Sequence, residues 1–196
     1  MVLSALSPVA GRRELDGLRV LDAGCGEGFL SAELSALGAD VTAIDVDMPT
    51  LDAARGEVGR RGGRGPVTFV LGDVMAHPFG AASFDGVVSI AVLHHLHAAR
   101  ALARFGQLVR RGGVVAVVGL ARARAPADLP YDVAGSVATA VHRLTTGITE
   151  VRAPTLGPPP LTYGEMRRLA TSVLPGCRYR RHTMFRYSLV WRRPTG

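Results

Sequence analysis

The stretch Val20-Leu-Asp-Ala-Gly-Cys-Gly-Glu-Gly28 decides the expected fold, because a short apolar run passes directly into a glycine-rich turn. The apolar run predicts a strand at about 19–23. Glycine lets the backbone bend sharply and lets a ligand approach more closely than a Cβ would allow. The next apolar run ends in Asp45, whose carboxylate at the tip of a second strand can accept both hydroxyls of a ribose. Together these features predict a pocket for an adenosine-containing cofactor.

The spacing of the glycines separates two kinds of cofactor. A dinucleotide-binding turn usually has the pattern G-x-G-x-x-G and faces a pyrophosphate with the amino end of a helix. Here the glycines fall at 24, 26 and 28, which gives G-x-G-x-G, and Asp22 precedes them. A carboxylate beside the turn disfavours a phosphate, whereas it suits a ligand that carries an amino group and a positive sulfur.

The turn resembles motif I of the class I S-adenosylmethionine (SAM) dependent methyltransferases, and further segments follow in the order of that family. Asp45 matches the ribose-binding acid, and Val46 matches the apolar residue that packs on the adenine. Gly72-Asp73-Val74 resembles motif II, whose acid hydrogen-bonds the adenine amino group. Three further segments resemble elements of that family. Segment 79–90 resembles the lead into strand four, Ala91-Val-Leu-His-His-Leu96 resembles the loop after that strand, and segment 108–113 resembles the turn before strand five.

The resemblance implies SAM as the cofactor and S-adenosylhomocysteine as its product. The expected cofactor-binding residues are Asp22, Gly24, Cys25, Gly26, Asp45, Val46, Asp73, Val74 and Ala91. Cys25 is expected to be a small buried residue of the turn and not a nucleophile, because no adjacent charge would lower its pKa. Met48 is interpreted as core filler, with a place against the adenine as the alternative.

The resemblance also implies an α/β fold: a single Rossmann-like, doubly wound, seven-stranded sheet of order 3-2-1-4-5-7-6 with strand 7 antiparallel. Apolar periodicity agrees with this fold. It predicts strands at 41–45, 67–71, 85–90, 114–119, 177–182 and 184–191, and helices at 28–37, 49–60, 97–109 and 161–170. Thr162 and Glu165 would form a capping box at the start of the last helix. Residues 1–196 are expected to form one domain, with a substrate-covering insertion at about 121–165.

Two residue types are absent, and both absences exclude chemistry. The chain has no lysine, which excludes Schiff-base chemistry and a phosphate-loop lysine. It also has no asparagine, whereas methyltransferases of exocyclic amines usually carry Asn or Asp and two prolines after strand four. The acidic and asparagine ligand set of metal-dependent O-methyltransferases is missing as well. Two cysteines form neither a disulfide framework nor a metal cluster. A metal-independent mechanism is therefore implied, with no metal site.

Methyl transfer from a sulfonium is an in-line displacement, so the protein needs a base only if the acceptor must lose a proton. His95, followed by His94, is the candidate base, because both follow strand four and histidine titrates near neutral pH. Their alternative role is to anchor the backbone. A zinc site that includes His97 lacks an evident fourth ligand.

Tyr131, His142 and Tyr163 are the candidate substrate-binding residues, with ordinary helix packing as the alternative. The expected function is methyl transfer to a small-molecule acceptor, with O as the first expectation and then N or C, in bacterial secondary metabolism. One alternative is a non-catalytic SAM-binding module.

Another alternative is an RNA or protein methyltransferase that uses an arginine-rich C-terminal edge. The formal net charge of +7 permits a nucleic-acid surface, although nucleic acid is not the favoured partner, since the arginine spacing equally fits strands with one solvated face. No apolar run reaches 18 residues and no signal sequence is evident, so we expect a cytoplasmic protein without a membrane partner, as a monomer or weak homodimer.

Overall fold

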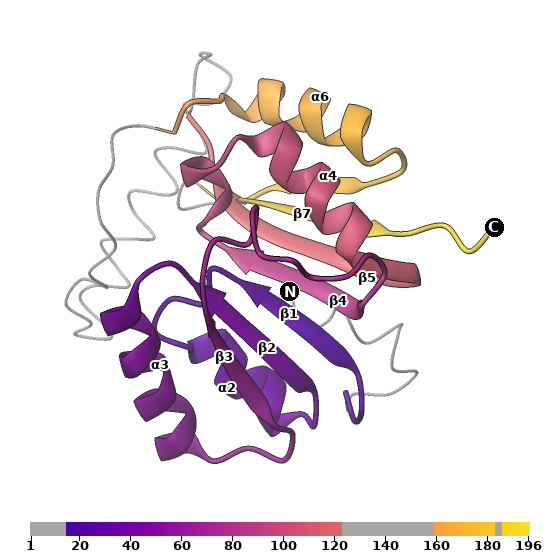
Figure 1. The fold of residues 1–196 in the computed structure, drawn as a ribbon. Coiled ribbons are helices and arrows are strands. Elements are labelled where there is room, and N and C mark those ends of the chain that lie inside the picture. The colour runs from indigo at the N-terminus through magenta and orange to yellow at the C-terminus, as the bar shows by residue number, and fades with distance from the viewer. Residues whose placement is uncertain (1–14, 123–158, 183–185) are drawn as a thin grey trace.

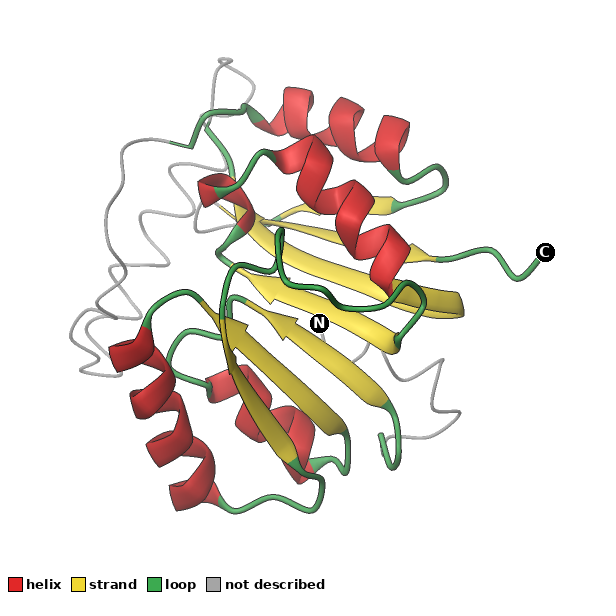
Figure 2. Cartoon of the chain, in the orientation of Figure 1, coloured by secondary structure: helices red, strands yellow, loops and turns green. Residues whose placement is uncertain are grey.

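The structure is a computed structural model that describes residues 15–122, 159–182 and 186–196. In chain order its elements are β1 (Arg19–Ala23), α2 (Phe29–Ala36), β2 (Asp40–Asp45), α3 (Met48–Arg61), β3 (Val67–Leu71), β4 (Phe84–Ile90), the short 3-10 helix η1 (Leu93–His95), α4 (Ala98–Leu108), β5 (Val109–Leu120), α6 (Tyr163–Val173), β6 (Arg178–Arg181) and β7 (Arg186–Arg192). From β1 to β3 and from β4 to α6 strands alternate with helices, as the apolar pattern predicts, whereas β3 leads directly into β4 and β6 into β7 (Figure 2). None of the described helices is both long and apolar enough to cross a bilayer.

The seven strands form one sheet in the order β3-β2-β1-β4-β5-β7-β6, which confirms the predicted topology (Figure 1). Strand β1 pairs in parallel with both β2 and β4. Strand β7 pairs antiparallel with both β5 and β6. The strand order reverses between β1 and β4, and open α/β sheets bind ligands outside the carboxyl ends of the strands at such a point.

Helices cover both faces of the sheet, with α2 and α3 on one face and α4 and α6 on the other (Figure 1). The core beneath α2 and α3 contains mostly alanine, valine and leucine side chains, among them Ala43 and Leu51. The core beneath α4 and α6 also contains large rings, including Phe105, Tyr187 and Trp191. The two faces are therefore packed with side chains of different size.

Two helices start at caps that the sequence supplies. The Asp47 carboxylate accepts a hydrogen bond from the backbone N–H of Thr50 at 3.0 Å and begins α3. At α6 the predicted capping box is confirmed: Glu165 accepts from the backbone N–H of Thr162 at 2.8 Å, and the Thr162 hydroxyl accepts from that of Glu165 at 3.3 Å. Such caps satisfy N–H groups that the first helical turn leaves unpaired.

Strand five begins earlier than predicted. The family resemblance places a turn at 108–113 and the apolar pattern starts the strand at 114, but β5 already starts at Val109. Phe84 pairs with Val109, whereas Gly86 pairs with Val114, so the register shifts and β5 carries extra residues between these pairs. An irregularity of this kind inserts residues into a strand without ending it. Arginines and glycines at 110–113 have the composition of a turn, which is why the sequence pattern misplaced the boundary.

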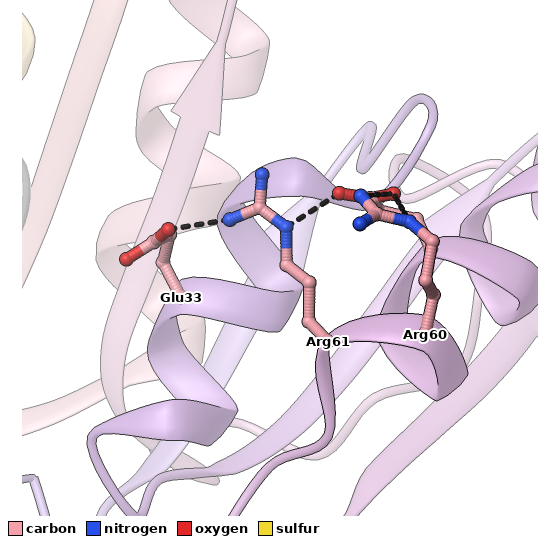
Figure 3. Close-up of polar contacts among 4 residues, drawn as sticks. Glu33, Arg60 and Arg61 are labelled. Carbon is pink, nitrogen blue, oxygen red and sulfur yellow. Dashed lines mark hydrogen bonds and ion pairs between the residues drawn. The ribbon is translucent and has the colours of Figure 1, made fainter.

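Charged side chains connect α2 and α3 at the surface (Figure 3). The Arg61 guanidinium contacts Glu33 and Glu57, each at 2.5 Å, and Arg60 contacts Glu57 at 2.6 Å. Exposed ion pairs contribute little to stability because water screens them. The closer link between the helices is apolar, since a Cβ at Gly28 would lie 2.8 Å from the Cβ of Ala54. Close backbone packing, more than charge, sets how α2 and α3 meet.

Candidate functional site

The turn between β1 and α2 has a backbone that favours glycine. Gly24, Gly26 and Gly28 have φ angles of 72°, 54° and 79°, in the left-handed region. The N–H groups of Gly24 and Cys25 both donate to the carbonyl oxygen of Ile44, at 2.9 and 3.1 Å, and so anchor the turn to β2. A Cβ at Gly26 would meet no atom within 4 Å. The space beside the turn is therefore open to a ligand.

Asp45 ends β2 beside this turn. Its Oδ2 accepts a hydrogen bond from the N–H of Gly26 at 3.0 Å, and its Oδ1 accepts one from the N–H of Asp47 at 3.2 Å. A carboxylate offers about four acceptor positions. The two backbone donors thus fix the orientation of the side chain and leave it the capacity to accept two ribose hydroxyls.

Asp22 is the buried acid of the site, with 1% of its surface exposed. Its Oδ2 accepts a hydrogen bond from the Ser31 hydroxyl at 2.6 Å. Burial raises the pKa of Asp22 to about 6, and the charge of Asp45 adds to this rise, while the Ser31 hydrogen bond opposes it. A cationic group bound nearby would stabilise the carboxylate form.

Large apolar side chains are exposed where β2, β3 and β4 end. The exposed fractions are 69% for Val46, 44% for Met48, 48% for Leu71 and 39% for Ile90. Exposed apolar surface along one edge of a sheet indicates a ligand surface. The exposure of Met48 corrects its interpretation as core filler: Met48 begins α3 at the edge of the sheet, and Leu51 is the residue of that first turn that enters the core.

The remaining predicted cofactor residues of these loops differ in burial. Asp73 is exposed, and its Oδ1 accepts from the N–H of Met75 at 2.8 Å. The Val74 side chain belongs to the core, so only its backbone can contact a ligand. Cys25 is also buried, and burial raises the pKa of its thiol to about 12. The thiol therefore stays protonated at neutral pH, as expected for a residue that is not a nucleophile.

The chain turns sharply after β4, at Ala91. This residue has a φ of 56°, which is unfavourable for a side chain with a Cβ, and its N–H donates to the carbonyl oxygen of Val118 at 2.8 Å. Val92 then packs on the glycine turn, because a Cβ at Gly24 would lie only 2.3 Å from its Cγ2. The loop after β4 is thus held directly against the glycine turn.

The three histidines of this loop have different environments. His94 is half-buried, and its Nδ1 is buried with no hydrogen-bond partner among the described residues. Burial lowers the pKa of His94, and the neighbouring His95 adds to this effect. His95 is exposed, with its ring 3.9 Å from that of His94. His97 accepts from the N–H of Arg100 at 3.5 Å and caps α4. Within the described ranges, no cluster of side chains suits a metal ion.

A small pocket opens beside His94. Its lining residues are Leu93, His94, Ala98, Leu120, Pro160, Leu161, Met166 and Tyr187. They come from η1, α4, the end of β5, the segment that leads into α6, α6 itself and β7. The lining contains no arginine and no acid, so His94 and Tyr187 supply its polar side-chain groups. Burial raises the pKa of Tyr187, which keeps its hydroxyl protonated.

Sequence reasoning did not single out Tyr187. This residue pairs with Gly119 across β5 and β7, and a Cβ at Gly119 would lie 2.4 Å from the Tyr187 hydroxyl oxygen. The ring therefore lies across the glycine, and only the strand register could have identified the pair. Tyr163 is buried beneath the Arg181 guanidinium, 4.1 Å from the ring centroid, and does not line the pocket. Tyr131 and His142 lie outside the described residues.

The sheet order, the glycine turn and the acid at the tip of β2 define a Rossmann-like methyltransferase fold, and similar proteins agree. The methyltransferase domain family matches residues 21–117. An uncharacterized methyltransferase of Mycobacterium tuberculosis is 38% identical over 176 residues, which is 89% of this chain and 87% of the relative. A ubiquinone biosynthesis O-methyltransferase of Methylocella silvestris is 39% identical over 104 residues, which is 53% of this chain and 40% of that protein.

Solved structures show the same fold. The magnesium protoporphyrin IX methyltransferase of Synechocystis, with bound S-adenosylhomocysteine, has a TM-score of 0.63 at 21% identity, covering 98% of this chain and 81% of that one. The chain belongs to the class I SAM-dependent methyltransferases, and SAM is its cofactor. The cyclase SpnF has a TM-score of 0.68 at 18% identity, with 98% and 81% coverage. The fold alone thus does not decide the chemistry, and the residues around the pocket must be considered.

Proposed function

We propose that the protein transfers the SAM methyl group to a hydroxyl oxygen of a small apolar acceptor, with His94 as the base. The observation that carries this proposal is the unpartnered, buried Nδ1 of His94 beside an apolar pocket. The same loop contacts the glycine turn through Val92, so the pocket and the cofactor turn are neighbours.

The cofactor would be held by the residues around the glycine turn. Asp45 would accept the two ribose hydroxyls, and Asp22 would balance the positive charge of the amino group. Val46 would pack on the adenine, whose amino group would donate to Asp73. The open space at Gly26 and the exposed side chain of Val46 fit such a ligand. Gly24 and Cys25 shape the turn, the backbone of Val74 follows Asp73, and Ala91 borders the site after β4.

SAM would supply a methyl group bound to a positive sulfur. When the acceptor oxygen bonds to the methyl carbon, the carbon–sulfur bond breaks and the sulfur leaves as a neutral thioether. The protein must align the acceptor hydroxyl with that bond and exclude water. His94 would take the hydroxyl proton on Nδ1. Because burial lowers the pKa of His94, its imidazole is neutral near pH 7 and able to accept a proton. The apolar lining of the pocket would keep water away from the reacting oxygen.

Named relatives support oxygen as the acceptor atom. An O-methyltransferase, cnsE, of Penicillium expansum and a magnesium-protoporphyrin O-methyltransferase of Rhodobacter capsulatus are 37% and 41% identical over 117 and 85 residues. The aligned segments span 40% and 37% of those proteins, so their substrates do not transfer directly. A role in bacterial secondary metabolism, the single-domain arrangement with an insertion at 121–165, and a monomer or weak homodimer stay predictions.

The test measures the turnover of phenols and other hydroxylated aromatic compounds by the His94→Gln and His95→Gln variants. The release of S-adenosylhomocysteine reports each turnover. His94→Gln should lower kcat by about 10²–10⁴, the usual contribution of a positioned base, while SAM affinity is unchanged. In the wild type, kcat should rise with pH through the lowered pKa of His94 and then level off. His95→Gln is the matched control and should keep most of the activity.

Calorimetric titration with SAM separates the possible failures. Asp45→Ala should abolish SAM binding and serves as the binding-negative variant. Equal losses in both histidine variants would remove His94 from the mechanism. SAM binding without turnover of any acceptor would favour the non-catalytic SAM-binding module.

A further inference from the structure

The net positive charge of the chain comes from its last segment. Residues 159–196 contain eight arginines and one acid, Glu165, and so carry a formal charge of +7, equal to that of the whole chain. The fifteen arginines and fifteen acids of residues 1–158 cancel. Glu165 belongs to the capping box of α6, where it bonds Thr162. The excess charge is therefore a local property of the region that forms α6, β6 and β7.

Strand register gathers four of these arginines on one face of the sheet. Arg178 and Arg180 on β6 pair with Val190 and Ser188 on β7. Side chains alternate along a strand, so Arg186 and Arg192, each two residues from one of these partners, point to the same side. We call the set Arg178, Arg180, Arg186 and Arg192 the arginine face. All four side chains are exposed, and no ion pair between described residues includes any of them.

The aromatic residues that alternate with these arginines lie on the opposite side. Tyr179, Tyr187 and Trp191 pack in or against the core beneath α4 and α6. Proteins that bind single-stranded nucleic acid stack bases on exposed aromatic rings. The described part of the arginine face offers guanidinium groups without such rings. Its chemistry therefore fits phosphate groups, which guanidinium binds through paired hydrogen bonds, and not bases.

We propose that the arginine face docks the protein on the surface of an anionic phospholipid bilayer. A pleated strand pair presents its guanidinium groups side by side, as the plane of lipid phosphates requires. The choice of a membrane also rests on the proposed function, since an apolar acceptor that fits the pocket beside His94 would concentrate in a bilayer. This docking differs from the sequence-based expectation of no membrane partner, and it needs no spanning helix.

The experiment is flotation of the full chain with vesicles of phosphatidylcholine, with and without phosphatidylglycerol. The wild type should float only with the anionic vesicles, and high salt should release it. The quadruple variant replaces the whole arginine face with glutamine: Arg178→Gln, Arg180→Gln, Arg186→Gln and Arg192→Gln. Its affinity for the anionic vesicles should fall by about 10²–10³, since each arginine near an anionic surface contributes about fivefold.

The matched control replaces four other exposed arginines with glutamine: Arg55, Arg60, Arg100 and Arg111. The control variant loses the same total charge. If the arginine face is the docking surface, this variant should keep most of its affinity for the vesicles. Calorimetric SAM titration shows that both variants are folded.

No flotation of the wild type, or equal losses in the two variants, would overturn the proposal. If the protein bound duplex or single-stranded RNA but not vesicles, the partner of the arginine face would be nucleic acid and the membrane proposal would be wrong. Flotation needs no turnover, so the result is independent of the acceptor chemistry.

Discussion

The molecule has two halves on opposite faces of the sheet: the core beneath α2 and α3, beside the glycine turn, is packed with small side chains, whereas the core beneath α4 and α6 also contains large rings. In the first half, Gly28 meets Ala54 so closely that a Cβ would not fit. In the second half, the Tyr187 ring covers Gly119, and the Trp191 indole donates to the carbonyl oxygen of Pro175 at 2.9 Å. The first half is shaped by the backbone, and the second by side chains from distant parts of the chain.

This difference separates two tasks. In the proposed function, the cofactor is held mainly at a backbone turn with two acids, Asp22 and Asp45. The proposed acceptor pocket would depend instead on rings such as Tyr187, whose replacement would change the shape of the pocket without touching the glycine turn. We therefore expect variants in one half to leave the task of the other largely intact.

The largest effect is expected for Tyr187→Ala. Removing this buried ring would leave a cavity over Gly119 and cost about 3–5 kcal/mol of unfolding free energy, as for other core aromatic residues. SAM affinity, measured by calorimetry below the melting temperature, should change little. Tyr187→Phe keeps the ring and should lower kcat/KM only if the hydroxyl contacts the acceptor, with Tyr179→Phe as the control. A large loss of SAM affinity in Tyr187→Ala would show that the halves are not separable.

Gly24→Ala tests the contact between the halves. A Cβ would lie 2.3 Å from Cγ2 of Val92, a β-branched side chain that cannot turn aside easily. Gly17→Ala is the control, because Gly17 has a similar φ of 71° but no atom within 4 Å of the added Cβ. Denaturant unfolding should show about 1–3 kcal/mol more destabilisation for Gly24→Ala than for the control, the usual cost of overpacking. Val92→Ala combined with Gly24→Ala should recover part of that loss; no recovery would place the strain elsewhere.

The smallest effect is the pH dependence of SAM binding through Asp22. The pKa of Asp22 is raised to about 6 by burial, so below that pH the free protein holds a neutral carboxyl group. SAM affinity should fall as the pH drops through 6, by up to about tenfold per unit, because the cation binds the carboxylate form. Calorimetry at several pH values measures this slope, and Asp22→Asn should flatten it. A slope that persists in Asp22→Asn would assign the titration to another group.

Folding without SAM responds to pH in the opposite direction. Because the folded-state pKa of Asp22 lies above its ordinary value of 3.8, the folded chain holds the proton more tightly than the unfolded chain. The contribution of Asp22 to stability is therefore largest at low pH and falls as the pH rises from about 4 to about 6.

The sequence predicted the cofactor half well. Strands β1 and β3 have the predicted bounds, because short apolar runs bordered by glycine leave few alternatives. The sheet order followed from the family resemblance. Less could be predicted beyond β4: His94 and His95 share one loop, and only the packing shows that His94 lines the pocket while His95 is exposed. The contact of Tyr187 with Gly119 depends on strand register, which no local pattern contains.

Strand β6 forms one edge of the described sheet, and it has only four residues. A strand at the end of a sheet presents unpaired N–H and C=O groups, to which a strand of another molecule can add. The positive charges of Arg178 and Arg180 repel the same edge of a second copy and so oppose edge-to-edge aggregation. A chain in which these two charges are removed should therefore scatter more light at high concentration than one that loses the same charge elsewhere.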